Sequence, residues 1–469
     1  MEGLHEIIER RGWTPDDTQN INDYKFFRAA CRNERVNEGI IRCLLTCFPV
    51  AVSATSEKGW SPLHFACFNK NLTLGIIQLL VDVAPDSVRS LNNRGNMPLH
   101  AFSSSASKMN EAAATEMLKL LIKKCPEAVR HANNSGDLPI HLAAKRKSPE
   151  FCQVLIEAYT GSEQIPNVSG ALPFHIACQY NTVDTVEYLY RLYPDALDHA
   201  TTEGAYPMHY TISSTKHRDY PATAVDIVRF LLDCDPNEKL KQCHGQSLLR
   251  VACGRKYNDS NIEAGIGMIE TLYDAHPEAI ESTRMAANIQ SFHHQVQTFI
   301  NEELVYARQA EDLRLMMTPD DNGQLPLHTA LQNNVRLGSV KLLVKGNPSA
   351  IRNVDVNFAM PLHIACEHHD SVDVVQYLLG LLDATTLRAV DIDNNTALHY
   401  ACRGAKHDSI ALLLETYDAA SVSKSNADGK LPIDLLWESN AANRGSVEYT
   451  GSVFQLLRAF PESLQSAIR

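Results

Sequence analysis

The chain has 469 residues, of which 44% are hydrophobic and 21% charged, so it has the composition of an ordinary folded protein with room for several cores. Its 43 Lys and Arg residues face 55 Asp and Glu residues, and the resulting net charge of -12 without a long basic run disfavours nucleic acid as a ligand. The start of the chain lacks the apolar core of a secretory signal, and no window approaches the roughly 18 apolar residues of a membrane span. Twelve cysteines without a C-x-x-C motif indicate a reducing compartment. We therefore expect a cytosolic protein, with the nucleus as the alternative.

One short phrase recurs along the chain. It reads SPLHFAC at 61, MPLHAFS at 97, LPIHLAA at 138, LPFHIAC at 172, YPMHYTI at 206, LPLHTAL at 325, MPLHIAC at 360 and TALHYAC at 396. Weaker copies fall in phase at 24, 247 and 431, where Arg28, Arg250 and Asp434 replace the histidine. Most copies lie 34 to 36 residues apart. This period predicts a repeat architecture of about eleven units.

Each unit reads as two helices followed by a turn. In the unit at 360, Leu362, Ala365, Cys366 and His369 form one helical stripe, and a second stripe runs from Val374 to Leu379. A proline usually follows the second helix, and then a turn cluster such as NNRG, NNSG or NADG. Such a unit is too small to bury its own apolar faces, so stacked neighbours must cover them.

The repeat is interrupted between Arg250 and His328, which are 78 residues apart. Residues 281–318 lack the repeat phrase but predict an amphipathic helix, marked by Ile289, Phe292, Val296, Phe299, Ile300 and Leu304. Two interpretations stay open for this insert: a degenerate repeat that serves as a spacer, or an element specific to one partner. Residues 1–23 and the end of the last unit are expected to cap the exposed ends of the array.

The P-L-H-x-A phrase with a helix pair at this period resembles the ankyrin repeat. The resemblance implies an all-α fold with hairpin-like turns, an α-solenoid of helix-turn-helix units. We assign residues 1–23 to an N-terminal cap, 24–280 to about seven repeats, 281–318 to the insert, and 319–469 to four repeats including the C-terminal cap. This chain mostly lacks the threonine that precedes the proline in the family. That loss of a hydroxyl N-cap, worth about 1 kcal/mol, predicts a looser array.

The unit at 360 also crowds His363, Cys366, Glu367, His368, His369 and Asp370 together, which raises the question of a metal or catalytic site. No two of these histidines have the i, i+3 or i+4 spacing that lets two helical side chains hold one metal. The cysteine position recurs in other units and alternates there with Ala144, Ile212 and Leu331, as a core position would. We therefore predict no metal, no cofactor and no catalytic residue, and hence a protein that is not an enzyme.

The repeated histidine has a structural interpretation. A neutral imidazole donates at one nitrogen and accepts at the other, so it can connect its own turn to the backbone of the next unit. The ankyrin resemblance implies this role for His64, His100, His141, His175, His209, His328, His363 and His399.

By the same resemblance, the turn tips and first helices bind a protein partner, and the chain is an interaction scaffold or adaptor. The candidate contact residues are Lys58, Trp60, Asn92, Arg94, Asn134, Glu203, Asp320, Asp355, Asp393 and Asp428. These tips are mostly acidic or amide-bearing, which favours a basic partner surface. The alternative is a regulatory subunit whose insert at 281–318 docks and controls a partner enzyme. A monomer without a membrane span is expected in both cases.

Overall fold

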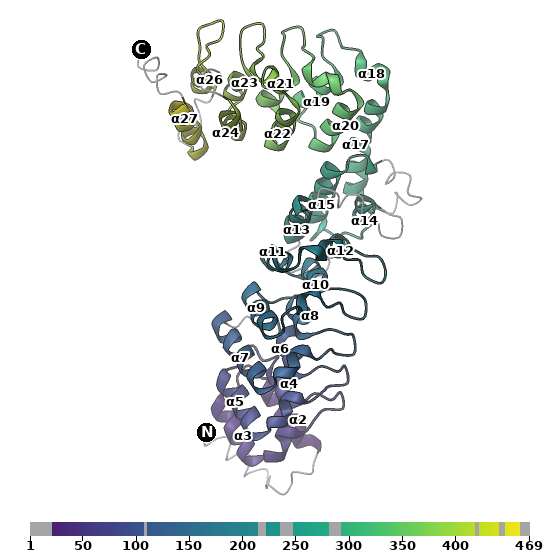
Figure 1. The fold of residues 1–469 in the computed structure, drawn as a ribbon, viewed down its shortest axis with the longest axis vertical. Helices are drawn as coiled ribbons and strands as arrows, with labels where there is room; N and C mark the ends of the chain where they lie inside the picture. The colour runs from purple at the N-terminus through teal and green to yellow at the C-terminus, as the bar shows by residue number, and fades with distance from the viewer. Residues whose placement is uncertain are drawn as a thin grey trace. The chain divides into compact units, whose positions relative to one another are not determined.

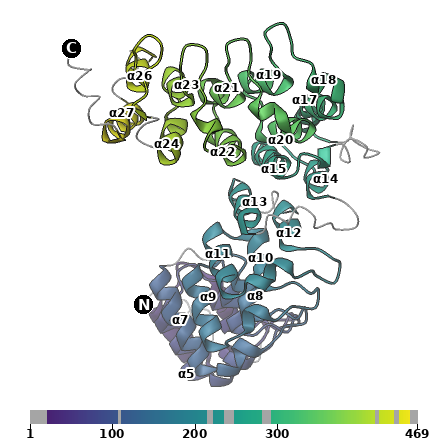
Figure 2. The same cartoon turned by 45° about the horizontal axis from the view of Figure 1, so that its top comes forward.

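The computed structural model describes residues 21–106, 110–213, 222–234, 247–280, 292–417, 422–439 and 446–459. The chain forms two compact units, residues 1–268 and 269–469 (Figures 1 and 2). This boundary lies within α15 (Ile262–Ala275), upstream of the insert at which the sequence pattern breaks. Tyr273 near the end of α15 contacts side chains of the second unit, which explains why the last turns of this helix belong there.

The described residues are built from helix pairs without strands. The first helices of the pairs, here called inner helices, are in the first unit α2 (Ile21–Arg32), α4 (Pro62–Ala66), α6 (Pro98–Ser104), α8 (Pro139–Ala143), α10 (Pro173–Tyr180), α12 (Pro207–Ser213) and α14 (Leu248–Cys253). Their outer partners are α3 (Glu38–Cys47), α5 (Leu74–Val83), α7 (Glu111–Lys124), α9 (Pro149–Ala158), α11 (Val183–Leu192), α13 (Thr223–Cys234) and α15.

The second unit repeats this arrangement. Its inner helices are α19 (Pro326–Gln332), α21 (Pro361–His368), α23 (Ala397–Arg403) and α26 (Pro432–Ser439). Its outer helices are α20 (Leu337–Gly346), α22 (Val372–Leu381), α24 (His407–Thr416) and α27 (Val447–Ala459). Within each unit the inner helices form one layer and the outer helices a second, and the connecting loops project on the side of the inner layer (Figure 1). The helix-turn-helix repeats that the sequence predicts are therefore confirmed.

Stacking of the pairs builds the core. The small or apolar position three residues after the repeated histidine is buried in every unit where it was singled out: Cys31, Cys67, Ala144, Cys178, Ile212, Cys253, Leu331, Cys366 and Cys402. The outer helices bury stripes such as Ile76, Ile77 and Leu80 on α5, and Val374, Val375 and Leu378 on α22. Each stripe packs against the neighbouring pair, because a single pair cannot enclose its own apolar surface.

The proline that follows many of the outer helices does more than end them. Pro49, Pro85, Pro126, Pro194 and Pro348 each begin a 3-10 turn, at η2 (Pro49–Ser53), η3 (Pro85–Arg89), η4 (Pro126–Arg130), η6 (Pro194–Asp198) and η10 (Pro348–Arg352). The fixed φ of proline suits the first position of such a turn, where its missing N–H needs no partner. The turn buries one or two apolar residues, such as Ala51 and Val52, before the chain enters the loop.

The described part of the insert contains a helix that the sequence predicts. α17 (His294–Glu311) buries Val296, Phe299, Ile300 and Leu304, and α18 (Leu313–Met317) follows it. Phe292 lies just before α17 and is half-buried, whereas Ile289 lies outside the described residues. Residues 1–20 of the predicted N-terminal cap and the last ten residues of the predicted C-terminal cap also lie outside them.

Candidate protein-binding surface

The loops that connect the pairs end in five-residue turns, here called fingers. They span 56–60, 92–96, 133–137, 167–171 and 201–205 in the first unit, and 320–324, 355–359, 391–395 and 426–430 in the second. In each finger the first N–H donates to the fifth carbonyl, and the fourth N–H donates to the first carbonyl. These bonds close the turn and leave the side chains of its middle residues at the tip.

An Asn or Asp at the first position fixes most fingers. The Asn92 Oδ1 accepts the N–H groups of Arg94 (2.9 Å) and Asn96 (3.0 Å). The Asp355 carboxylate accepts those of Asn357 and Ala359, both at 2.9 Å. Asp320 forms the same two bonds at 2.9 and 2.8 Å. Short polar side chains favour such turns because they reach their own backbone two residues on.

Successive fingers are also joined to each other. The second N–H of a finger donates to the third carbonyl of the finger before it, as from Asn93 to Lys58 (3.0 Å) and from Ile392 to Asn357 (2.8 Å). The fingers of one unit therefore form a continuous backbone ladder in the stretches that the structure describes. Side chains at the second, third and fourth positions are the ones presented along this ladder.

The structure places the candidate contact residues in two groups. Asn92 and Asp355 are buried, and with Asp320 they are the turn-forming first residues, a role that the sequence did not assign to them. The other group is exposed at the tips: Lys58, Arg94, Asn134, Glu203, Asp393 and Asp428. Contact with a partner stays a prediction for both groups.

Trp60 is half-buried at the base of the first finger. Its ring lies 5.8 Å from that of Phe65 and 5.4 Å from that of Phe68, measured between centroids, and these two rings are also partly exposed. Aromatic rings at such distances attract each other beyond simple burial. The inner surface of the first unit thus starts with an aromatic cluster.

Sequence reasoning missed an apolar group at the tips of the second unit. Val356, Phe358 and Ile392, here called the tip patch, are 58%, 56% and 62% exposed on two neighbouring fingers. Phe358 occupies the fourth finger position with φ of +60°, where most other fingers have glycine with φ between +72° and +78°. The departure of DVNFA from the usual N-x-x-G pattern is the signal that could have revealed it.

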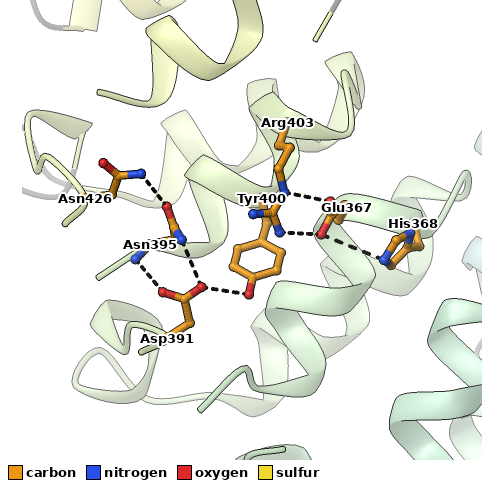
Figure 3. A network of polar contacts seen from close by, with 7 residues as sticks. All are labelled: Glu367, His368, Asp391, Asn395, Tyr400, Arg403 and Asn426. Atoms are coloured by element: carbon orange, nitrogen blue, oxygen red, sulfur yellow. Dashed lines mark hydrogen bonds and ion pairs between the residues drawn. The ribbon is translucent and has the colours of Figure 1, made fainter. Parts of the chain in front are cut away.

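Two inner helices and two fingers of the second unit share a polar network (Figure 3). Arg403 donates to both carboxylate oxygens of Glu367 (2.7 and 2.6 Å) and lies 4.3 Å from the ring centroid of Tyr400. The hydroxyl of Tyr400 donates to Asp391 (2.9 Å), and Asn395 donates to the same carboxylate, also at 2.9 Å. Burial and the neighbouring Asp391 carboxylate raise the pKa of Tyr400 well above its usual value.

In the structure, most polar side chains of the crowded segment at 363–370 have partners within the protein. Glu367 forms an ion pair with Arg403, and Asp370 forms one with Lys406 (2.5 Å). His369 is buried and bonds to the carbonyl of Val335 (2.7 Å), whereas His368 stays partly exposed. Among the described residues, no three His, Cys, Asp or Glu side chains are grouped as a metal site.

Most of the repeated histidines bridge neighbouring repeats, whereas the buried Nε2 of His141 has no hydrogen-bond partner in the described part of the chain. The Nδ1 of His363 accepts the N–H of Met360 (3.1 Å), and its Nε2 donates to the carbonyl of Ala389 (3.2 Å). His64 forms the same pair of bonds, to Ser61 at 3.2 Å and to Asn96 at 2.9 Å. Burial lowers the pKa of His64, His100, His363 and His399 to about 4 and that of His175 to about 3. The rings are therefore neutral at pH 7, as a group that both donates and accepts must be.

The missing N-cap hydroxyls have a structural substitute. In several units without the hydroxyl, the N–H of the histidine donates to the backbone carbonyl three residues before it, at 2.9 Å for His100 and 2.8 Å for His328. At Asp434 a carboxylate oxygen accepts the N–H of Leu431 (2.8 Å) and so replaces the imidazole in closing the turn. The first turns of these helices therefore keep their backbone partners.

Within the described ranges, no helix is long and apolar enough to cross a membrane. A family model described as ankyrin repeats (3 copies) matches residues 104–198, 285–386, 335–426 and 362–443. Together these matches cover more than half of the chain, and they include residues 285–443 of the second unit with its tip patch. The chain belongs to the ankyrin repeat family.

Proposed function

We propose that this chain is a non-catalytic scaffold or adaptor that binds a protein partner through its fingers and inner helices. The observation that carries the proposal is the tip patch, where large apolar side chains project into solvent from a rigid backbone ladder. The ankyrin family generally mediates contacts between proteins, which supports the proposal that this patch is a contact surface.

The conformation of Phe358 supports a role outside folding. A non-glycine residue in the left-handed region costs about 1–2 kcal/mol, and a bulky side chain there is uncommon. Burial of the side chain offsets only part of this cost, because Phe358 is 56% exposed. An exposed aromatic side chain held at a strained position is the kind of anchor that fills a pocket on a partner.

Charge near the patch favours a basic partner segment. Asp320, Asp393 and Asp428 are exposed on the same or neighbouring fingers of the second unit. A partner that places an apolar side chain against Phe358 and a Lys or Arg beside it would complement both features. In the first unit, Trp60 with Lys58 and Arg94 offers a separate contact region of opposite charge.

The repeated histidine and cysteine side chains are buried in the core, which supports a non-catalytic role. The bridging histidines are neutral and hydrogen-bonded, and burial raises the pKa of the Cys67, Cys152 and Cys253 thiols to about 12. Thiols in this state are poor nucleophiles. We place this binding role in the cytosol, with the nucleus as the alternative, and expect a monomer on size-exclusion chromatography with light scattering.

A single substitution separates binding from folding. Phe358→Gly removes the anchor and the backbone strain together, so we expect loss of the partner that co-purifies from a cell extract and a higher melting temperature. The matched control Asn394→Gly changes the same finger position (φ of +62°) in the next finger and leaves the patch intact. If the Phe358→Gly protein retains every partner of the wild type, the tip patch is not the binding surface.

A further inference from the structure

A second surface is built by the part of the chain that departs from the repeat. α17 packs along α20 through Phe299, whose ring lies 5.6 Å from that of Tyr273 and under the guanidinium of Arg336. Its inward face also carries Glu303, which is 6% exposed and accepts a hydrogen bond from Ser339 (2.5 Å). The Tyr273 hydroxyl lies 3.0 Å from the same Ser339 hydroxyl. These buried polar bonds fix the position and rotation of α17 on α20.

Arg336 strengthens this attachment. It forms an ion pair with Glu270 of α15 and lies 3.5 Å from Glu303 of α17, so one cation joins three helices. Burial raises the pKa of Glu303, and the nearby Arg336 acts in the opposite direction. A partly buried charge network of this kind holds only when its geometry is kept. We therefore expect α17 to keep a fixed position on α15 and α20 and to form one side of any site beside it.

A groove of about 660 Å³ runs beside α17. Its first side is α17, at Glu302, Val305 and Tyr306, and the facing side consists of the turns at 334–337 and 369–371. In the regular repeats, such a turn can be bonded directly to the turn before it, as His369 is to Val335 and Asn181 is to Lys147. α17 is one continuous helix, so it meets the turn at 334–337 with side chains, and the space between them is the groove.

The side chains along the groove combine apolar surface with negative charge. Val305 is 52% exposed, and Tyr306 and Leu337 are half-buried beside it. Four carboxylates line the groove: Asp274, Glu302, Glu303 and Asp370. Arg336 lies beside Glu303, Lys406 pairs with Asp370, and Asp274 accepts the N–H of Gly338. Glu302 is exposed and forms no ion pair within the described part of the chain.

From this geometry we propose that the groove beside α17 docks a segment of a partner protein that carries a Lys or Arg next to apolar side chains. The basic side chain pairs with Glu302, and the apolar ones cover Val305, Tyr306 and Leu337. This site is separate from the tip patch, so it neither requires nor repeats the role proposed for the fingers. It also gives a physical basis to the idea that the insert holds a second protein.

Surface substitutions test the groove better than removal of the insert, because α17 buries core residues. The probe is a phage-displayed library of random peptides about 12 residues long, selected on the full chain and on Glu302→Lys and Val305→Asp variants. The best peptide is then synthesised and titrated against each protein by fluorescence anisotropy. Glu415→Lys, an equal charge change at an exposed position of α24, is the matched control.

We expect the wild-type selection to enrich peptides that combine Lys or Arg with Leu, Ile or Phe. Glu302→Lys and Val305→Asp should each weaken binding by about tenfold or more, because one repels the basic side chain and the other removes apolar contact. Glu415→Lys and Phe358→Gly should leave the affinity within about twofold. The proposal is overturned if no basic peptide is enriched, if the groove variants bind as well as the wild type, or if binding is lost with Phe358→Gly. The last result would assign the peptide to the fingers.

Discussion

The fingers of the two units have the same backbone conformation but differ in the side chains at the tip. In the first unit the fourth position is glycine in every finger described, including Gly59, Gly95 and Gly136, all with positive φ. In the second unit Phe358 and Asn394 take the same conformation without being glycine. The bonds within each finger and the ladder between fingers are the same in both units. The frame of the repeat is therefore independent of the side chains that the tips display.

The histidine bridges belong to the shared frame, so acid should destabilise both units and give the largest effect. Because burial holds the pKa of His64, His100, His363 and His399 near 4, the unfolded chain, with pKa about 6.5, binds protons first as the pH falls. Stability is then full above about pH 6.5 and decreases down to about pH 4, by ~3 kcal/mol for each of these histidines.

Hydrogen exchange measured by mass spectrometry between pH 7 and pH 4.5 follows each unit separately. We expect protection of inner helices to fall in both units over the same pH range, with His64 and His363 as representatives. Loss of protection in only one unit would show that the histidine bridges do not contribute equally to the stability of the two units. The shared frame would then differ between them. His363→Gln, which keeps one donor and one acceptor, is the control that should reduce the pH dependence of its own unit.

The fingers of the first unit should tolerate a side chain at the fourth position less well than those of the second unit. A Cβ added at Gly136 would lie 2.7 Å from the backbone nitrogen of Val168 in the next finger, and φ there is +76°. Gly136→Ala should therefore lower the free energy of unfolding by about 2–4 kcal/mol, from backbone strain plus displacement of the next finger.

Gly429→Ala supplies the comparison for that measurement. It has the same φ of +76°, but no described atom lies within 4 Å of the added Cβ. Only the strain of about 1–2 kcal/mol should then appear. Chemical denaturation of both variants gives the two values, and equal losses would mean that close approach between fingers plays no part.

Most of the frame could be predicted from the sequence, because it depends on local patterns that repeat. The phrase around His363 recurs often enough to mark inner helices, and the stripe from Val374 to Leu379 marks an outer helix. The tip residues were harder, since Asn92 and Asp355 resemble exposed turn residues in sequence, yet they are buried beneath the turn. Burial of a turn side chain depends on the neighbouring finger, which is far away in sequence.

The groove beside α17 could not be foreseen for a related reason. The periodicity of Val296, Phe299, Ile300 and Leu304 predicts a helix but not the helix against which it packs. Arg336, which joins α17 to α15, is 33 residues after Glu303 and 66 after Glu270, without a repeat to align them. Only the folded chain shows that these charges meet.

The smallest expected effect separates the two exceptional fingers of the second unit. Asn tolerates the left-handed region better than most residues, and the side-chain amide of Asn394 donates to the carbonyl of Ser425 (2.9 Å). Asn394→Gly should thus change the free energy of unfolding by less than about 0.5 kcal/mol, because relief of mild strain is offset by the lost hydrogen bond. Phe358→Gly should stabilise the chain by about 1 kcal/mol, since the strain that it relieves exceeds the small burial that the exposed ring loses. Equal effects of the two variants in urea denaturation would mean that Phe358 is not strained, and its place at the tip would then need no partner to explain it.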